Sequence, residues 1–73
     1  MNPLHPKKLL LSKWTASVPI AKQKHFLVSR VIQPEHIGDA IELVELEAVL
    51  SKATQIIAWR ALQHEEAWTQ GWV

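Results

Sequence analysis

Four histidines are the residues best suited to metal binding or acid–base catalysis, but their spacing supports neither. They are His5, His25, His36 and His64. No histidine lies three or four positions from another histidine or from a cysteine, which is the spacing that local zinc sites use. The segment His64-Glu65-Glu66 resembles half of a zinc helix but lacks the second histidine. We therefore expect surface histidines, no catalytic residue, no metal and no other cofactor.

Glu45 and Glu47 are the acids whose spacing could serve acid–base chemistry, because alternate residues of a strand share one face. Paired carboxylates do such chemistry only in a cleft that raises the pKa of one of them. The chain has only two glycines, with no glycine-rich phosphate loop and no Gly-x-Ser-x-Gly motif. We expect a solvated face instead, on which these acids meet Lys24, Arg30 or Lys52 across neighbouring strands.

Nucleic-acid binding is the most specific chemistry that the basic residues suggest. Lys7, Lys8 and Lys13 flank Trp14. Cations beside an exposed aromatic ring neutralise phosphates while the ring stacks a base, for about 1–3 kcal/mol per base. However, the formal net charge is only +1, and a stacking platform normally has several aromatic rings on one face. Weak binding of single-stranded nucleic acid, RNA in particular, is therefore the alternative function.

The four tryptophans divide into two pairs with different expected roles. Trp14 and Trp59 lie in strand-like segments and are expected mainly in the core. Trp68 and Trp72 are four positions apart, so a helical turn would stack them on one face, where they could cap the sheet or offer a surface. An edge strand, or an incompletely covered tryptophan pair, could seat a peptide or a second copy. The candidate binding surface comprises Lys7, Lys8, Lys13, Trp14, Trp68 and Trp72.

Length and composition favour one small domain. Its 73 residues allow one hydrophobic core with a thin stability margin, and large aromatic side chains would reinforce it because cysteine is absent. Residues 1–30 carry six cations and no acid, whereas residues 31–73 carry seven acids and two cations. Pairing of oppositely charged strands would explain this asymmetry.

The lack of cysteine fits a reducing compartment, and no targeting or membrane segment is convincing, so we expect a cytoplasmic protein.

Prolines and β-branched residues indicate the elements on either side of residues 41–62. Residues 1–8 contain two prolines and are expected as an extended amino-terminal arm. An extended segment follows over residues 9–17. Residues 25–32 are the clearest strand, because they are rich in β-branched and aromatic residues. Residues 64–68 could form a short helical turn, with Gly71 suited to end it.

Residues 41–62 allow two interpretations. Apolar residues recur at helical spacings of three and four, at Leu43, Leu46, Leu50, Ala53, Ile57 and Ala61. The same stretch also alternates as a strand, with Glu45 and Glu47 on one face, and would continue through a turn at residues 51–54 into a second strand. That turn contains no glycine, asparagine or proline, which counts against the hairpin. The residues themselves leave both interpretations open.

Five short motifs form a joint pattern along the chain. They are Lys13-Trp14-Thr15-Ala16, Lys24-His25-Phe26, Leu46-Glu47-Ala48-Val49-Leu50, Trp59-Arg60-Ala61-Leu62 and Trp68-Thr69-Gln70-Gly71-Trp72. Together they resemble a family of short tryptophan-rich bacterial proteins of unknown function, from about residue 2 to residue 72. The resemblance implies a small antiparallel sheet closed by a C-terminal helical turn, and it implies no activity.

We therefore predict a mainly β fold, with a small antiparallel sheet of three to four strands and a short C-terminal helical turn, in one domain over residues 1–73. The alternative is an α+β fold in which residues 41–62 are largely helical. The predicted function is a non-enzymatic binding or interaction domain that takes a protein partner or a second copy.

Overall fold

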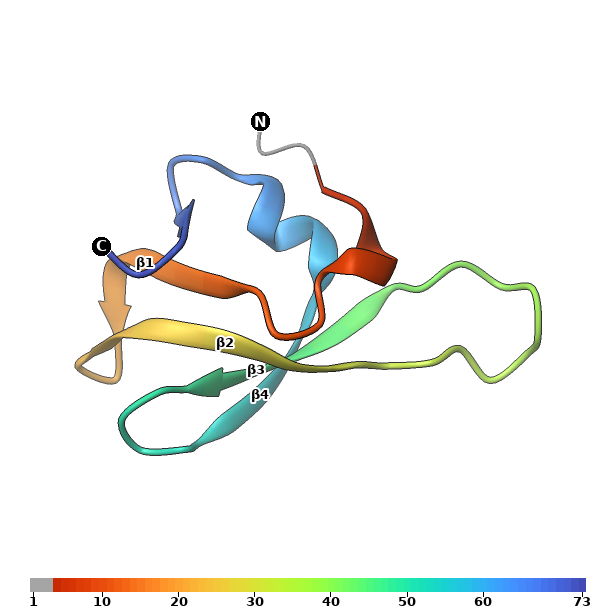
Figure 1. Ribbon diagram of the computed structural model, residues 1–73, viewed down its shortest axis with the longest axis horizontal. Helices are drawn as coiled ribbons and strands as arrows, with labels where there is room; N and C mark the ends of the chain where they lie inside the picture. The colour runs from red at the N-terminus through yellow and green to blue at the C-terminus, as the bar shows by residue number, and fades with distance from the viewer. Residues whose placement is uncertain (1–3) are drawn as a thin grey trace.

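Five β-strands form one antiparallel sheet in the computed structural model, which describes residues 4–73 (Figure 1). The strands are β1 (Lys13–Ile20), β2 (Gln23–Val31), β3 (Leu43–Ala48), β4 (Thr54–Ala58) and β5 (Trp68–Gln70). Their order across the sheet is β4-β3-β2-β1-β5. The helical elements of residues 4–73 are two 3-10 turns, η1 (Pro6–Lys8) and η2 (Trp59–Gln63). The predicted mainly β fold is therefore confirmed.

The sheet has more strands than the three to four predicted, because the chain end adds a fifth. Residues 64–68 form the expected turn, in which the His64 carbonyl oxygen accepts the Trp68 N–H at 2.9 Å. The chain then runs on as β5, and Trp68 pairs with Ala16 of β1. This pairing satisfies backbone groups on the outer side of β1 and buries the Trp68 ring, which an isolated turn could not do.

The helical alternative for residues 41–62 is wrong. Val44, Leu46 and Ala48 are buried on one face of β3, and β3 pairs with both β2 and β4. A two-residue period fits burial against a sheet, and this tertiary contact outweighs the helix propensity of the glutamates and leucines. Helical structure in the segment is limited to η2, which begins at Trp59.

The extended arm predicted for residues 1–8 is wrong over Pro6–Lys8, which form η1; residues 1–3 lie outside the described part. Pro6 occupies the first position of the turn, where its fixed φ is suitable and its missing N–H costs nothing. Leu9 follows directly and is buried in the core, which holds the turn against the sheet. None of the helical segments within residues 4–73 is long and apolar enough to cross a membrane.

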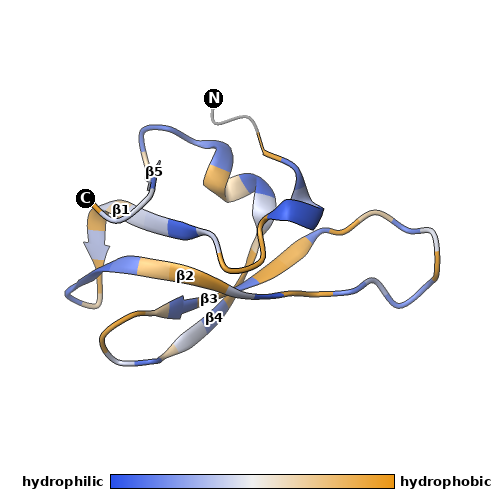
Figure 2. Ribbon diagram, viewed as in Figure 1, coloured by the Kyte–Doolittle hydropathy of each residue, from blue (hydrophilic) through white to orange (hydrophobic). Residues whose placement is uncertain are grey.

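One face of the sheet carries the hydrophobic core. Apolar side chains of β1, β2 and β3 supply its floor, and residues from the two 3-10 turns and their flanks cover it on the side where both turns lie in Figure 1. Figure 2 shows hydrophobic residues in the middle of β2 and in the first part of β3, as well as in loops that connect the strands. The buried members are Leu9, Trp14, Ala16, Phe26, Val28, Val44, Leu46, Ala48, Trp59, Leu62 and Trp68. We call the opposite face of the sheet the open face.

Left-handed residues other than glycine make both tight hairpin turns. Ala21 and Lys22 have φ of 50° and 66° between β1 and β2, and Lys52 has φ of 66° between β3 and β4. The first is a two-residue hairpin, which favours such a mirror-image turn because its twist matches that of the strands. The second connection spans residues 49–52, and the Lys52 N–H donates to the Ala48 carbonyl oxygen at 2.9 Å. The Ser51 hydroxyl accepts the Ala53 N–H at 3.1 Å and supports the second turn. These turns therefore form without the glycine or asparagine that sequence signals rely on.

Candidate functional site

Trp14 lies in the core and does not belong to an exposed binding surface. Its exposed fraction is 0%, and its indole N–H donates to the Ser12 hydroxyl at 2.9 Å. A ring that stacks on a base must present a face to solvent. Lys7 and Lys8 lie on η1, so the predicted grouping of these lysines around an accessible Trp14 is not formed. Trp14 therefore has the core position that the sequence predicts.

Trp59 and Trp68 are also buried. The Trp59 indole N–H donates to the Ile41 carbonyl oxygen at 2.8 Å, which ties η2 to the start of β3. The Trp68 ring packs edge-on against Phe26, with ring centroids 5.6 Å apart and planes at 79°. Edge-to-face contacts of this kind add to the stabilisation from burial. Three of the four tryptophans therefore build the core.

Trp72 is the one tryptophan with a large exposed fraction, 43%, and it lies on the open face. Its indole N–H donates to the Phe26 carbonyl oxygen at 2.9 Å, and the Lys13 ammonium lies 4.7 Å from the ring centroid. The His25 ring is 6.4 Å away. Trp68 and Trp72 are therefore not stacked on one face, because β5 directs the first ring into the core and the second lies across β1 and β2.

The segment that carries Trp72 is fastened to the open face by its backbone. The Thr15 hydroxyl donates to the Gly71 carbonyl oxygen at 2.7 Å and accepts the Val73 N–H at 3.1 Å. The His25 Nε2 lies 2.9 Å from the Val73 carbonyl oxygen. Gly71 has φ of 91°, so it supplies the left-handed bend that the sequence predicts there. Of the candidate surface, the structure therefore brings together Lys13 and Trp72.

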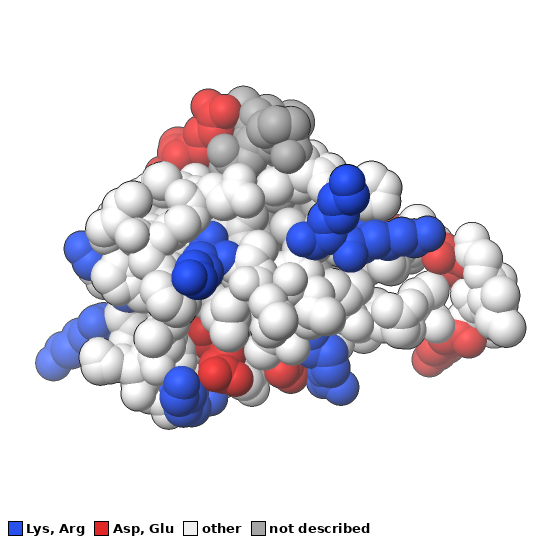
Figure 3. Space-filling view, in the orientation of Figure 1, with Lys and Arg blue, Asp and Glu red and all other residues white. Residues whose placement is uncertain are grey.

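Charged side chains are dispersed over the surface. Figure 3 shows two basic side chains that adjoin on the face in view, while acidic and uncharged groups separate the other lysines and arginines, so this face has no continuous basic groove. Glu45 contacts Arg30 at 3.2 Å and Glu47 contacts Lys52 at 4.0 Å. Of the three predicted partners, Arg30 meets Glu45 across β2 and β3, Lys52 meets Glu47 from the turn before β4, and within residues 4–73 the ion pairs of these two acids do not include Lys24. The pair across β2 and β3 also accounts for part of the charge asymmetry between the two halves of the chain.

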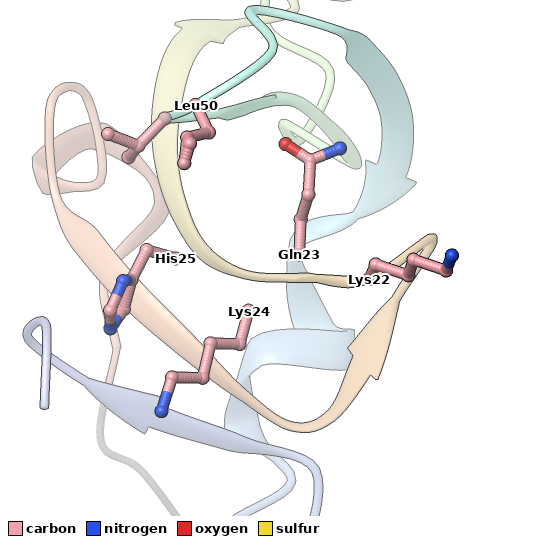
Figure 4. Close-up of a pocket in the computed structure, with 6 residues that line it drawn as sticks. Lys22, Gln23, Lys24, His25 and Leu50 are labelled. Atoms are coloured by element: carbon pink, nitrogen blue, oxygen red, sulfur yellow. The ribbon is translucent and has the colours of Figure 1, made fainter.

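The hollow beside the β1–β2 turn does not direct its amino groups toward a common point (Figure 4). A cavity of about 180 Å³ lies at the start of β2, lined by Lys22, Gln23, Lys24, His25, Val49 and Leu50. Figure 4 shows the amino groups of Lys22 and Lys24 pointing in different directions rather than toward a common point. Among residues 4–73, no three histidine, aspartate or glutamate side chains are grouped in a way that could hold a metal ion.

The feature that sequence reasoning missed is the outer edge of β4. The Ala48 N–H donates to the Ala53 carbonyl oxygen at 2.8 Å, and the Trp59 N–H donates to the Glu42 carbonyl oxygen at 3.1 Å. Hydrogen-bonded pairs alternate in an antiparallel ladder, so odd-numbered residues of β4 bond to β3. The N–H and C=O groups of Thr54, Ile56 and Ala58 must then point away from the sheet.

This edge lacks the features that usually prevent strand addition. Natural sheets protect their edges with charged residues, proline, bulges or very short strands. β4 has five residues, Thr-Gln-Ile-Ile-Ala, without charge or proline, and it pairs with β3 without a register shift. The opposite edge is protected: β5 has three residues, and the part of β1 beyond it contains Pro19. Ile56 adds an apolar side chain that is 49% exposed.

Comparison with protein families matches residues 12–73 to the family described as tryptophan-rich protein (DUF2389). The chain belongs to this family. The resemblance predicted from the motifs is confirmed, although the match begins at residue 12 rather than near residue 2. Comparison with curated proteins gives no match, and neither does comparison with solved structures.

The family match includes some residues of the candidate surface and leaves out others. In this tryptophan-rich domain the matched segment contains all four tryptophans and β4, whereas Lys7 and Lys8 precede it. Trp14, Trp59 and Trp68 are explained by the core, so the tryptophan richness of the domain is largely a matter of packing. The open edge of β4 also lies in the matched segment, and packing of the core does not explain it.

Proposed function

We propose that this tryptophan-rich domain is a non-enzymatic interaction domain of the bacterial cytoplasm, which binds an extended strand along the outer edge of β4. The supporting observation is the row of outward backbone groups on Thr54, Ile56 and Ala58. Addition of a strand to an open sheet edge uses main-chain hydrogen bonds for affinity and alternate side chains for specificity. The cysteine-free composition fits the proposed compartment.

The side chains around the edge suit an uncharged, partly apolar strand. Ile56 projects from the open face, and Ile57 packs against the core from the other side. Gln55 and Thr54 border a small hollow of about 150 Å³ that also includes the buried Phe26 and Ala48. A bound strand would extend both faces of the sheet beyond β4, where its own apolar side chains would meet these residues.

A peptide that corresponds to residues 52–60 of the chain is a direct probe of this edge, because its central five residues already form a strand here. We expect saturable binding in the micromolar-to-millimolar range, measured by fluorescence anisotropy of the labelled peptide. The Ile56→Pro variant of the domain is expected to abolish binding. The Ile56 N–H points away from β3, so proline at this position removes a donor for the peptide without removing a hydrogen bond of the sheet.

Matched variants separate strand addition from general stickiness. Ile56→Lys and Ile37→Lys both replace an exposed isoleucine with a cation, but only the first lies on the edge. Circular dichroism verifies that each variant is folded. The proposal predicts weaker binding for Ile56→Lys alone, with little dependence on salt. It is contradicted if the peptide does not bind, or if Ile56→Pro binds it as well as the unmodified domain.

A further inference from the structure

We infer that the strand which occupies the β4 edge is β4 of a second copy of this chain, paired antiparallel about a two-fold axis at Ile56. This inference rests on the proposed function and names its partner. The two copies would form one continuous sheet with their core faces on the same side, because an antiparallel pair is related by an axis perpendicular to the sheet.

The positions of the outward backbone groups are symmetric about Ile56. Thr54 and Ala58 lie two residues on either side of it, and all three residues present N–H and C=O groups outward. In the symmetric register Thr54 opposes the partner's Ala58, and Ile56 opposes the partner's Ile56. This register forms three opposed pairs, and each pair exchanges two hydrogen bonds, so the outward N–H and C=O groups of all three residues are bonded. A shift of two residues in either direction leaves only two pairs.

The side chains are compatible with their own copies. The two Ile56 side chains would meet on the open face as an apolar cross-strand pair, and Thr54 would meet the small side chain of Ala58. No charged residue lies within β4 to repel its copy. Beyond the strand, Lys52 would approach the partner's Arg60.

Each of these flanking cations already has an acid of its own chain. Lys52 lies 4.0 Å from Glu47, and Arg60 lies 3.7 Å from Glu42. The flanks would therefore bring together two neutralised pairs rather than two free cations. The chain leaves the sheet on both sides of β4, into a turn before Thr54 and into η2 after Ala58. The interface is consequently short, and we expect weak, concentration-dependent dimers.

Disulfide trapping tests both the partner and the register, since the chain contains no cysteine. In the symmetric register the two copies of residue 56 have Cα atoms about 5.5 Å apart, which suits a disulfide. The two copies of residue 54 are separated by about 14 Å, which does not. In a glutathione redox buffer we expect Ile56→Cys to form covalent dimers at least about ten times faster than the matched variant Thr54→Cys.

Two further measurements complete the test. The double variant Thr54→Cys/Ala58→Cys is expected to form dimers, because residue 54 then opposes the partner's residue 58. Sedimentation of the unmodified chain is expected to show a mass that rises with concentration from 8.3 kDa toward twice that value. Faster trapping of Gln55→Cys than of Ile56→Cys would overturn the symmetric register.

The outcomes distinguish the two proposals. If the residue 52–60 peptide binds the edge while the chain stays monomeric and Ile56→Cys is trapped no faster than Thr54→Cys, the second copy is the wrong partner and edge binding stands. If the peptide also fails to bind, both proposals fail. Trapping of Ile56→Cys with a concentration-dependent mass of the unmodified chain supports both.

Discussion

Replacing Trp14 by alanine is expected to lower the free energy of unfolding by about 3–5 kcal/mol. The ring has an exposed fraction of 0%, so its removal leaves a cavity at the centre of the core and removes the indole N–H that donates to the Ser12 hydroxyl. A chain of 73 residues has a total stability of about 4–11 kcal/mol. The substitution should therefore remove a large part of the total stability, as measured by urea denaturation followed by circular dichroism.

Trp72→Phe is the control for this experiment. Phenylalanine retains an aromatic ring on the open face but loses the indole N–H that donates to the Phe26 carbonyl oxygen. Loss of one such hydrogen bond costs about 0.5–1.5 kcal/mol. Similar losses for Trp14→Ala and Trp72→Phe would contradict the assignment of Trp14 to the core and of Trp72 to the surface.

Leu62→Ala is expected to destabilise the domain by about 2–5 kcal/mol, the usual range for a buried leucine. Leu62 has an exposed fraction of 0% although it lies in a five-residue 3-10 turn at the surface of the fold. Its side chain is part of the layer that covers the sheet, so its loss should expose the core beneath η2. Urea denaturation followed by tryptophan fluorescence measures the change.

The matched control for Leu62→Ala is Leu50→Ala. Leu50 lies in the β3–β4 turn with 81% of its surface exposed, so the same substitution there removes no buried side chain. Its expected effect is within about 0.5 kcal/mol of zero. Equal effects at the two positions would show that η2 does not cover the core.

The strand pattern of the sequence predicted the centre of the fold better than its ends. Residues 25–32 were identifiable because β-branched and aromatic residues are concentrated there, and β2 spans Gln23–Val31. The β3–β4 hairpin was ambiguous because its turn uses Lys52 in a left-handed conformation, which composition does not indicate. β5 was missed because three residues carry little periodicity of their own.

The candidate site was harder to predict, because it depends on the order of strands in the sheet. Residues 54–58 are uncharged, as a central strand often is, and only the placement of β4 outside β3 makes them an edge. The exposure of Trp72 likewise follows from the bend at Gly71, which returns the chain across the open face. By contrast, the pairing of Glu45 with Arg30 was predictable from alternation and charge.

Amide hydrogen exchange at single residues tests the open edge of β4 most directly. In the free domain, the Ile57 amide is bonded to β3 and should be protected, whereas the Ile56 and Ala58 amides should exchange freely. On saturation with the residue 52–60 peptide, or at high protein concentration, exchange at Ile56 and Ala58 should slow by about tenfold or more while Ile57 changes little. If Ile56 and Ala58 still exchange freely under both conditions, β4 does not accept a strand.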